Sequence, residues 1–221
     1  MKNIFTLCFI LLSTSLLAQG TKFGATIGAT NYTTDTNYLF SKSGTGFTFG
    51  LMVNRVYNDR SSLFLEFNYN EHYFKILGRE TEQSSSEYIK FKLPEFSIPL
   101  IYNYNYLLLD NFKLGINAGP SLHFIHNIIL VDESKEPYLL DPFQVFPSEL
   151  EFDTYSSEGT ISFNMFLAFG LSAQYQNNIM ANLRYYYGIT DPYRRSPVFI
   201  QGVGTTKGKD SYFSFTITYF F

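Results

Sequence analysis

The sequence predicts an all-β protein, an eight-stranded antiparallel up-and-down β-barrel that spans a membrane. Three observations predict this fold class: apolar and polar residues alternate along eight segments, short and long connections follow one another in turn, and the polar faces are rich in small residues. The composition agrees, because 45% of the residues are hydrophobic and 19% are aromatic, which favours strands over disorder.

The start of the chain has the pattern of a secretory signal peptide. Lys2 precedes an apolar run of about fifteen residues that ends at Ala18, which is short for a membrane-spanning helix. We therefore expect a signal peptide at 1–19 and a single barrel domain at 20–221. Cys8 is the only cysteine and lies within this signal, so disulfides and thiolate chemistry are not expected in the mature chain.

The alternation is clearest at the carboxy terminus. Between Tyr212 and Phe221 one face carries Phe, Ile and Tyr, and the opposite face is mostly hydroxylated. Seven earlier segments repeat the pattern, and none of their apolar faces carries a charge. These segments are 23–29, 47–53, 63–69, 96–104, 112–124, 161–175 and 179–189.

The size of the barrel decides which face meets lipid. A soluble barrel would also alternate, so the pattern alone does not place the apolar face. An eight-stranded barrel has room inside for Gly, Ser, Thr and Asn, but not for eight rows of Phe, Leu and Tyr. The apolar faces must point outward on every strand, and this requires a membrane.

The connections between the segments give an independent criterion. Those expected to be short lie near 58–59, 107–111 and 176–178, and those expected to be long cover 31–45, 75–87, 130–159 and 191–210. Short periplasmic turns and long extracellular loops alternate in this way in outer-membrane barrels. Both termini are then expected to face the periplasm.

Three phrases of the sequence resemble a known group of barrels. They are Glu95 to Tyr102, Gly115 to Ser121 and the aromatic ending Tyr219-Phe220-Phe221. Together with the signal ending at Gln19, they resemble the PorT-type porin-like outer-membrane β-barrels of Bacteroidota. The resemblance implies a place in the Gram-negative cell outer membrane and a role for Phe221 in the signal read by the barrel-insertion machinery. One group of this family is implied in protein secretion.

Glu66 and Arg184 are the charged residues expected at inward, mid-strand positions. Their strands lie four apart in a ring of eight, so they face each other, and both residues have a similar depth. We expect an ion pair that closes the lumen, because small barrels are filled by side chains and a buried charge needs a partner. A proton or ion path is the alternative. The neighbours expected to make room are Thr26, Gly50, Asn117, Gly170 and Thr216.

The three histidines lie toward the extracellular ends of their strands. His123 and His126 are three apart and point to opposite faces of a strand, so no metal site is predicted. His72 and His123 could share the lumen rim and form a hydrolytic site with a loop carboxylate. No motif marks a nucleophile, so solvated rim histidines are preferred, and no catalytic residue or cofactor is predicted.

The connection 130–159 is acidic and also contains apolar residues. A loop of this length is usually either functional or disordered. Its apolar content indicates that it folds over the barrel mouth or presents a binding surface, and a solvated loop is the alternative. The candidate binding residues are Asp132, Glu133, Glu136, Asp141, Glu149, Glu151 and Asp153.

Three classes of function follow from these observations. The favoured one is a non-enzymatic outer-membrane barrel that acts as a scaffold or binding protein through its extracellular loops, as an accessory to secretion. The alternatives are an outer-membrane hydrolase or acyltransferase with a site at the extracellular rim, and a channel for small solutes. Expected partners are outer-membrane lipid, the insertion machinery and a protein bound by 130–159. The net charge of −3 gives no reason to expect nucleic acid.

Overall fold

The computed structural model describes residues 20–37, 39–81, 83–125, 128–136, 138–140, 162–191, 199–200, 204–205 and 207–221. The expected signal peptide at 1–19 lies outside these residues. The long strands are β1 (Thr21–Thr36), β2 (Ser41–Val56), β3 (Ser61–Arg79), β4 (Glu87–Leu108), β5 (Phe112–Ile125), β8 (Ser162–Tyr175), β9 (Ile179–Gly188) and β12 (Gly208–Phe220). The short elements are β6 (Ile129–Leu130), the 3-10 turn η1 (Glu133–Lys135), β7 (Leu139–Leu140), β10 (Phe199–Ile200) and β11 (Gly204–Thr205).

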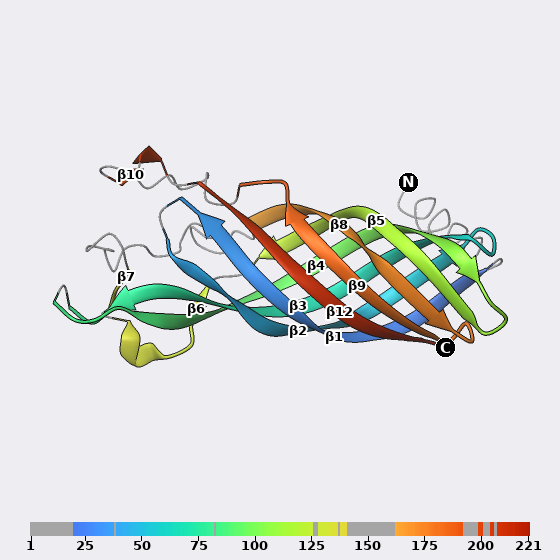
Figure 1. Cartoon of the computed structure of the whole chain (residues 1–221), viewed down its shortest axis with the longest axis horizontal. Coiled ribbons are helices and arrows are strands. Elements are labelled where there is room, and N and C mark those ends of the chain that lie inside the picture. Colours follow the sequence, from blue (N-terminus) through green and yellow to red (C-terminus); the bar gives the residue numbers. More distant parts are fainter. Residues whose placement is uncertain are drawn as a thin grey trace, which may run out of the picture.

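The long strands form a closed antiparallel ring (Figure 1). Each strand pairs with the next long strand along the chain, and β1 pairs with β12 from Gly24 opposite Phe220 to Thr36 opposite Gly208. The predicted fold class, an eight-stranded up-and-down barrel, is therefore confirmed. In the described ranges, no helix is long and apolar enough to cross a membrane.

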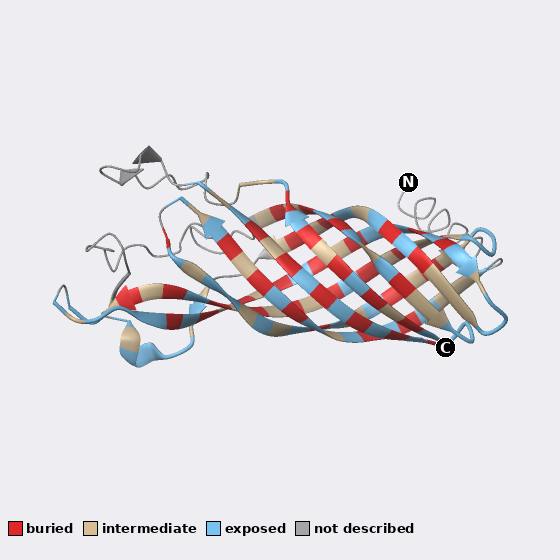
Figure 2. Ribbon diagram, viewed as in Figure 1, coloured by how far each residue is buried: buried red, intermediate tan, exposed pale blue. Residues whose placement is uncertain are grey.

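Buried and exposed residues alternate along every long strand, and Figure 2 shows the resulting chequered pattern around the barrel. Outward Ile27 and Phe96 are 68% and 63% exposed, while their inward neighbours Thr26 and Ser97 are 4% and 2% exposed. The predicted outward apolar faces are thus confirmed. Large inward side chains also fill the lumen, among them Met52, Phe64, Ile101 and Met180.

The two ends of the barrel differ in their connections. The turn end carries 57–60, 109–111 and 176–178, together with Gly20 and Phe221. The opposite end is the loop end. At 176–178, Gln176 and Asn177 have φ angles of 47° and 63°, and the Asn178 N–H donates to the Tyr175 carbonyl at 3.2 Å. This is the type I′ geometry that suits a tight hairpin.

Two connections expected to be long are shortened by strand at both ends, so this part of the prediction is wrong in its bounds. In place of a loop at 31–45, β1 and β2 continue to Thr36 and from Ser41. In place of a loop at 75–87, β3 runs to Arg79 and β4 starts at Glu87. Their backbones stay paired beyond the apolar band, where the side chains no longer follow the pattern used to recognise a strand in lipid.

β3 and β4 project beyond their neighbours at the loop end (Figure 1), and we call residues 73–79, 87–93, β6 and β7 the projecting sheet. β6 pairs with β4 at residues 91–92, and β7 pairs with β3 at 78–79. The inward side chains here are apolar, and Ile128, Leu130 and Tyr138 pack against this core. The buried core residues on the two strands are Phe74, Ile76, Ile89, Phe91 and Leu93.

Candidate functional site

The structure brings Glu66 of β3 and Arg184 of β9 together inside the barrel. Arg184 Nη1 donates to Glu66 Oε1 at 2.7 Å, and both side chains are 2% exposed. Two amides add hydrogen bonds to the pair, since Arg184 Nε donates to Asn117 Oδ1 at 3.2 Å and Asn68 Nδ2 donates to Glu66 Oε2 at 3.1 Å. A buried ion pair is tolerable only with such additional hydrogen bonds.

Two glycines next to this pair make room for its side chains, because they lack a Cβ atom. A Cβ atom on Gly170 would lie 2.6 Å from Arg184 Cγ, and one on Gly50 would lie 2.3 Å from Asn68 Oδ1. Thr26 bonds to Thr218 at 2.8 Å between their hydroxyls. Larger residues at the two glycines would displace the side chains that surround the ion pair.

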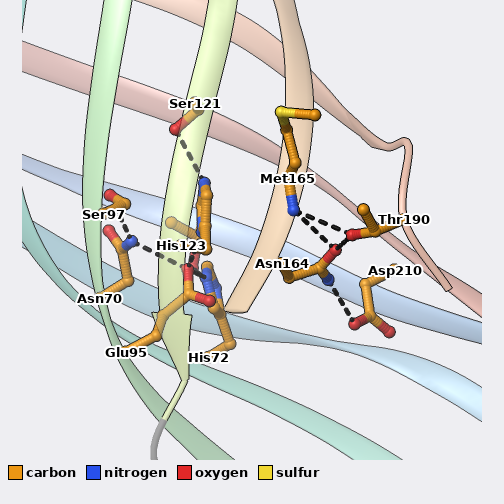
Figure 3. Close-up of polar contacts among 11 residues, drawn as sticks. Asn70, His72, Glu95, Ser97, Ser121, His123, Asn164, Met165, Thr190 and Asp210 are labelled. Carbon is orange, nitrogen blue, oxygen red and sulfur yellow. Dashed lines mark hydrogen bonds and ion pairs between the residues drawn. The ribbon is translucent and has the colours of Figure 1, made fainter. Parts of the chain in front are cut away.

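A second polar cluster lies nearer the loop end and is centred on Glu95 of β4 (Figure 3). Glu95 Oε1 lies 2.9 Å from His72 Nε2, 2.7 Å from His123 Nδ1 and 3.0 Å from Asn70 Nδ2, which donates to it. His123 Nε2 in turn lies 2.8 Å from Ser121 Oγ. Because β3, β4 and β5 are adjacent in the ring, their alternation places all these side chains in the lumen.

This cluster is closed off from solvent. His72, Ser121 and His123 are 0% exposed and Glu95 is 1% exposed. Aromatic rings surround the imidazoles, with centroids 4.7 Å apart for Tyr32 and His72 and 4.3 Å apart for His123 and Phe166. The cluster fills the lumen as a polar core does.

These positions correct two expectations about the lumen. Glu95 is a third buried inward charge besides Glu66 and Arg184, and Asp210 on β12, 1% exposed, is a fourth. His72 and His123 were expected as solvated rim histidines, with a hydrolytic site that included a loop carboxylate as the alternative, but they are buried against the strand carboxylate of Glu95. The missed signal was the alternation itself, because β4 starts well before the expected first residue at 96 and Glu95 continues its inward face.

A smaller polar group closes the loop end between β8, β9 and β12 (Figure 3). Asn164 Nδ2 donates to Asp210 Oδ2 at 3.2 Å, and the Met165 N–H donates to both Asn164 Oδ1 and Thr190 Oγ1 at 2.9 Å. These bonds tie the end of β9 to the start of β8.

The acidic loop candidates lie partly outside the described residues. Asp132 caps η1, because its Oδ1 accepts from the Ser134 backbone N–H at 3.2 Å and from the Ser134 hydroxyl at 2.7 Å. Glu133 and Glu136 are exposed at this turn. The residues outside the described ranges are Asp141, Glu149, Glu151, Asp153 and His126.

No group of metal-ligating side chains occurs in the portion of the chain that the structure describes.

The turn η1 is held against the projecting sheet, since Lys135 Nζ lies 2.7 Å from Glu87 Oε2. The hydrogen bond to this carboxylate raises the pKa of the Lys135 ammonium group.

Phe221 ends the chain at the turn end. Its side chain is 75% exposed and its N–H donates to the Phe23 carbonyl at 3.0 Å, which holds it on the ring beside β1. The terminal residue therefore presents its ring on the outside of the barrel. The role expected for it in insertion depends on this accessibility.

Solved structures with the same fold were found by structural comparison. OprG of Pseudomonas aeruginosa is 13% identical with a TM-score of 0.49, covering 91% of this chain and 96% of that chain. Ail, the attachment invasion locus protein of Yersinia pestis, is 13% identical with a TM-score of 0.44, covering 92% and 100%. Neisserial surface protein A is 14% identical with a TM-score of 0.43, covering 91% and 99%.

Sequence comparison identifies the family of the chain. No match was found among curated protein sequences. A family model described as "Outer membrane protein beta-barrel domain" matches residues 13–194, which is most of the chain. Together with the closed ring and its outward apolar faces, this match shows that the protein belongs to the family of outer membrane protein β-barrel domains.

Proposed function

We propose that this chain is a non-enzymatic outer-membrane barrel that acts as a scaffold or binding protein through the surface at its loop end. In this proposal the loop end lies outside the cell, both termini face the periplasm, and the barrel is a PorT-type accessory to protein secretion. The insertion machinery reads Phe221, and the connection 130–159 with its acidic residues contacts a protein partner.

The observation that carries the proposal is the contrast between a filled lumen and a projecting sheet. Inside the barrel, the Glu66–Arg184 pair crosses the lumen between β3 and β9, and the Glu95 cluster and the aromatic rings packed on it fill the lumen at a second level. Beyond the barrel, the projecting sheet buries apolar side chains on its inward face and forms a salt bridge to η1. An ordered surface that extends past the membrane supports binding, and a filled lumen gives no support to a solute path.

The test uses affinity purification from outer membranes. One variant lacks 130–159, and another joins Tyr73 to Lys92 through Asn-Gly, because these two residues are direct cross-strand partners. We expect loss of a specific cross-linked protein partner from both. The control is the interior double variant Glu66→Leu with Arg184→Met, which should retain the partner. Retention of every partner by both loop-end variants would contradict the proposal.

One observation favours the hydrolase alternative. Ser121 Oγ, His123 and Glu95 follow one another in the order of nucleophile, base and orienting acid, with separations of 2.8 and 2.7 Å. The burial of all three residues opposes it, because a substrate must reach the nucleophile. Labelling with a fluorophosphonate probe decides between a hydrolytic and a structural role for Ser121, since an active serine would be labelled and a structural one would not.

A further inference from the structure

A row of lysines crosses the outward face of the strands at the loop end. Lys42 on β2 lies opposite Lys75 on β3, which lies opposite Lys90 on β4, and Lys92 extends the group along β4. We call these four residues the lysine row. In the described part of the chain, none of them forms an ion pair with a carboxylate. Like charges directly opposite one another destabilise a sheet, so an anion bound here would stabilise it.

Tyrosine rings hold two of these ammonium groups against the sheet. Lys42 Nζ lies 4.0 Å from the centre of the Tyr88 ring, and Lys90 Nζ lies 4.1 Å from the centre of the Tyr73 ring. The negative face of an aromatic ring attracts a cation at this distance. The positive charge is therefore gathered on the outer face, and the side chains do not simply extend into solvent.

A cleft of about 390 Å³ opens beside Lys75 and Lys90. Its other wall is the irregular stretch of β2 that begins at Ser43, where the register with β3 shifts before Phe47. A Cβ atom on Gly44 would lie 2.4 Å from the Tyr73 carbonyl oxygen, so glycine permits this close approach. Two ammonium groups beside serine and threonine hydroxyls suit a phosphate group.

A second cleft of about 500 Å³ lies on the same outer face closer to the middle of the barrel. Phe49, Phe67 and Phe96 line it, and its size and apolar walls suit an acyl chain. Tyr69 belongs to this cleft and Tyr73 to the basic one, and both hydroxyls donate to Glu71 between them. The two clefts are thus consecutive along β3.

The height of the lysine row matches a lipid headgroup. Tyr73 lies ten positions after Leu63 on β3, about 33 Å along the strand and about 25 Å along the membrane normal at a tilt near 40°. That is about the height of the apolar band of an outer-membrane barrel. Lys75 follows two residues later, at the level where the phosphates of the leaflet lie.

We propose that the lysine row and the two clefts form a binding site for a phosphorylated, acylated lipid of the outer leaflet. The phosphate contacts Lys42, Lys75 and Lys90, and one acyl chain lies in the apolar cleft. The assignment to the outer leaflet rests on the orientation given under the proposed function, whereas the site itself does not require a protein partner.

Native mass spectrometry of the purified barrel tests this site with three probes: bisphosphorylated lipid A, dephosphorylated lipid A and inorganic phosphate. We expect the triple variant Lys42→Gln, Lys75→Gln, Lys90→Gln to bind the phosphorylated lipid at least about tenfold more weakly than the unchanged barrel. Its affinity for the dephosphorylated lipid should change little. Circular dichroism verifies that the variant barrel is folded, which is expected because these side chains are outside the core.

The matched control replaces two lysines elsewhere at the loop end, Lys207→Gln with Lys209→Gln. Lys209 lies opposite Asp35 on β1, so its charge already has a counterpart in register. The control should bind the phosphorylated lipid as the unchanged barrel does. Equal weakening by the control, no weakening by the triple variant, or equally tight binding of inorganic phosphate would overturn the lipid site.

A separate measurement tests the proposed orientation independently of the lipid site. Ser85→Cys places a thiol in the exposed connection between β3 and β4. We expect a membrane-impermeant maleimide to label it in intact cells. Labelling only after the cells are broken would overturn the orientation and the outer-leaflet assignment, while the binding measurements would still decide whether the lipid site exists.

Discussion

β3 and β4 have opposite side-chain patterns in the barrel and in the projecting sheet. Within the barrel, Phe67 and Phe96 face outward while Glu66 and Glu95 are buried inside. In the projecting sheet, the inward side chains are apolar and the outward ones include Lys75, Lys90 and Lys92. The same two strands, which keep one antiparallel register at both levels, thus serve two environments.

The difference indicates that the solvent outside the sheet decides the pattern. Where lipid surrounds the barrel, outward residues must be apolar, and the lumen takes the polar groups. Where water surrounds the sheet, the apolar residues turn inward and charges face out. The change occurs between Glu71 and Lys75 on β3, so this stretch marks the edge of the apolar band.

The largest expected effect comes from the lumen. Arg184→Met leaves Glu66 buried without its partner, and we expect a loss of roughly 3–5 kcal/mol in the free energy of unfolding. Urea unfolding in lipid vesicles, followed by circular dichroism, measures it, since the chain has no tryptophan for fluorescence. The double variant with Glu66→Leu should recover most of the loss. An unchanged stability of the single variant would show that the pair is not essential to the barrel.

A second prediction tests whether the projecting sheet has a separate core. Phe91 packs on Phe74 with ring centroids 5.9 Å apart, and Phe91→Ala should destabilise the sheet locally by roughly 3 kcal/mol. Trypsin should then cut at Arg79 or Lys90 while the barrel stays intact. The surface variant Tyr88→Ala provides the control. If Phe91→Ala instead lowered the urea midpoint of the whole barrel, the two regions would form one cooperative unit.

A third prediction concerns the Glu95 cluster. Ser121→Ala removes one buried hydrogen bond to His123, and we expect a loss of about 1 kcal/mol in barrel stability. Fluorophosphonate labelling should be absent both before and after the substitution. Labelling of the unchanged protein that disappears in Ser121→Ala would reverse this assignment and make the cluster a catalytic site.

The barrel could be predicted from the sequence because the period-two pattern is repeated on eight strands. The outward faces of all eight strands meet the same surroundings, lipid. Glu66 and Arg184 could be placed in one lumen because strand order and depth follow from that pattern. The structure then supplies the contacts, such as the bond from Arg184 Nε to Asn117.

The projecting sheet could not be predicted by the same criterion. Lys75 was placed in the loop 75–87 and Lys90 before the strand expected from 96, because the expected strand had an apolar outer face. Once the apolar residues turn inward, the alternation continues with reversed faces, as Phe74 and Ile76 show. Glu95 was missed for a related reason, since the strand that carries it was expected to begin only at 96.

The smallest expected effect isolates the charges on the projecting sheet. Lys75→Glu places a negative side chain between Lys42 and Lys90, and cross-strand pairs of opposite charge contribute roughly 0.2–1 kcal/mol each. In detergent without phosphorylated lipid, we expect slower hydrogen exchange of the amides in the projecting sheet. Lys209→Glu should instead speed hydrogen exchange of the amides around it on β1 and β12, because it puts two negative side chains opposite each other at Asp35. Equal signs for the two variants would show that the lysine row is not under mutual repulsion, and the case for a bound anion would lose its electrostatic basis.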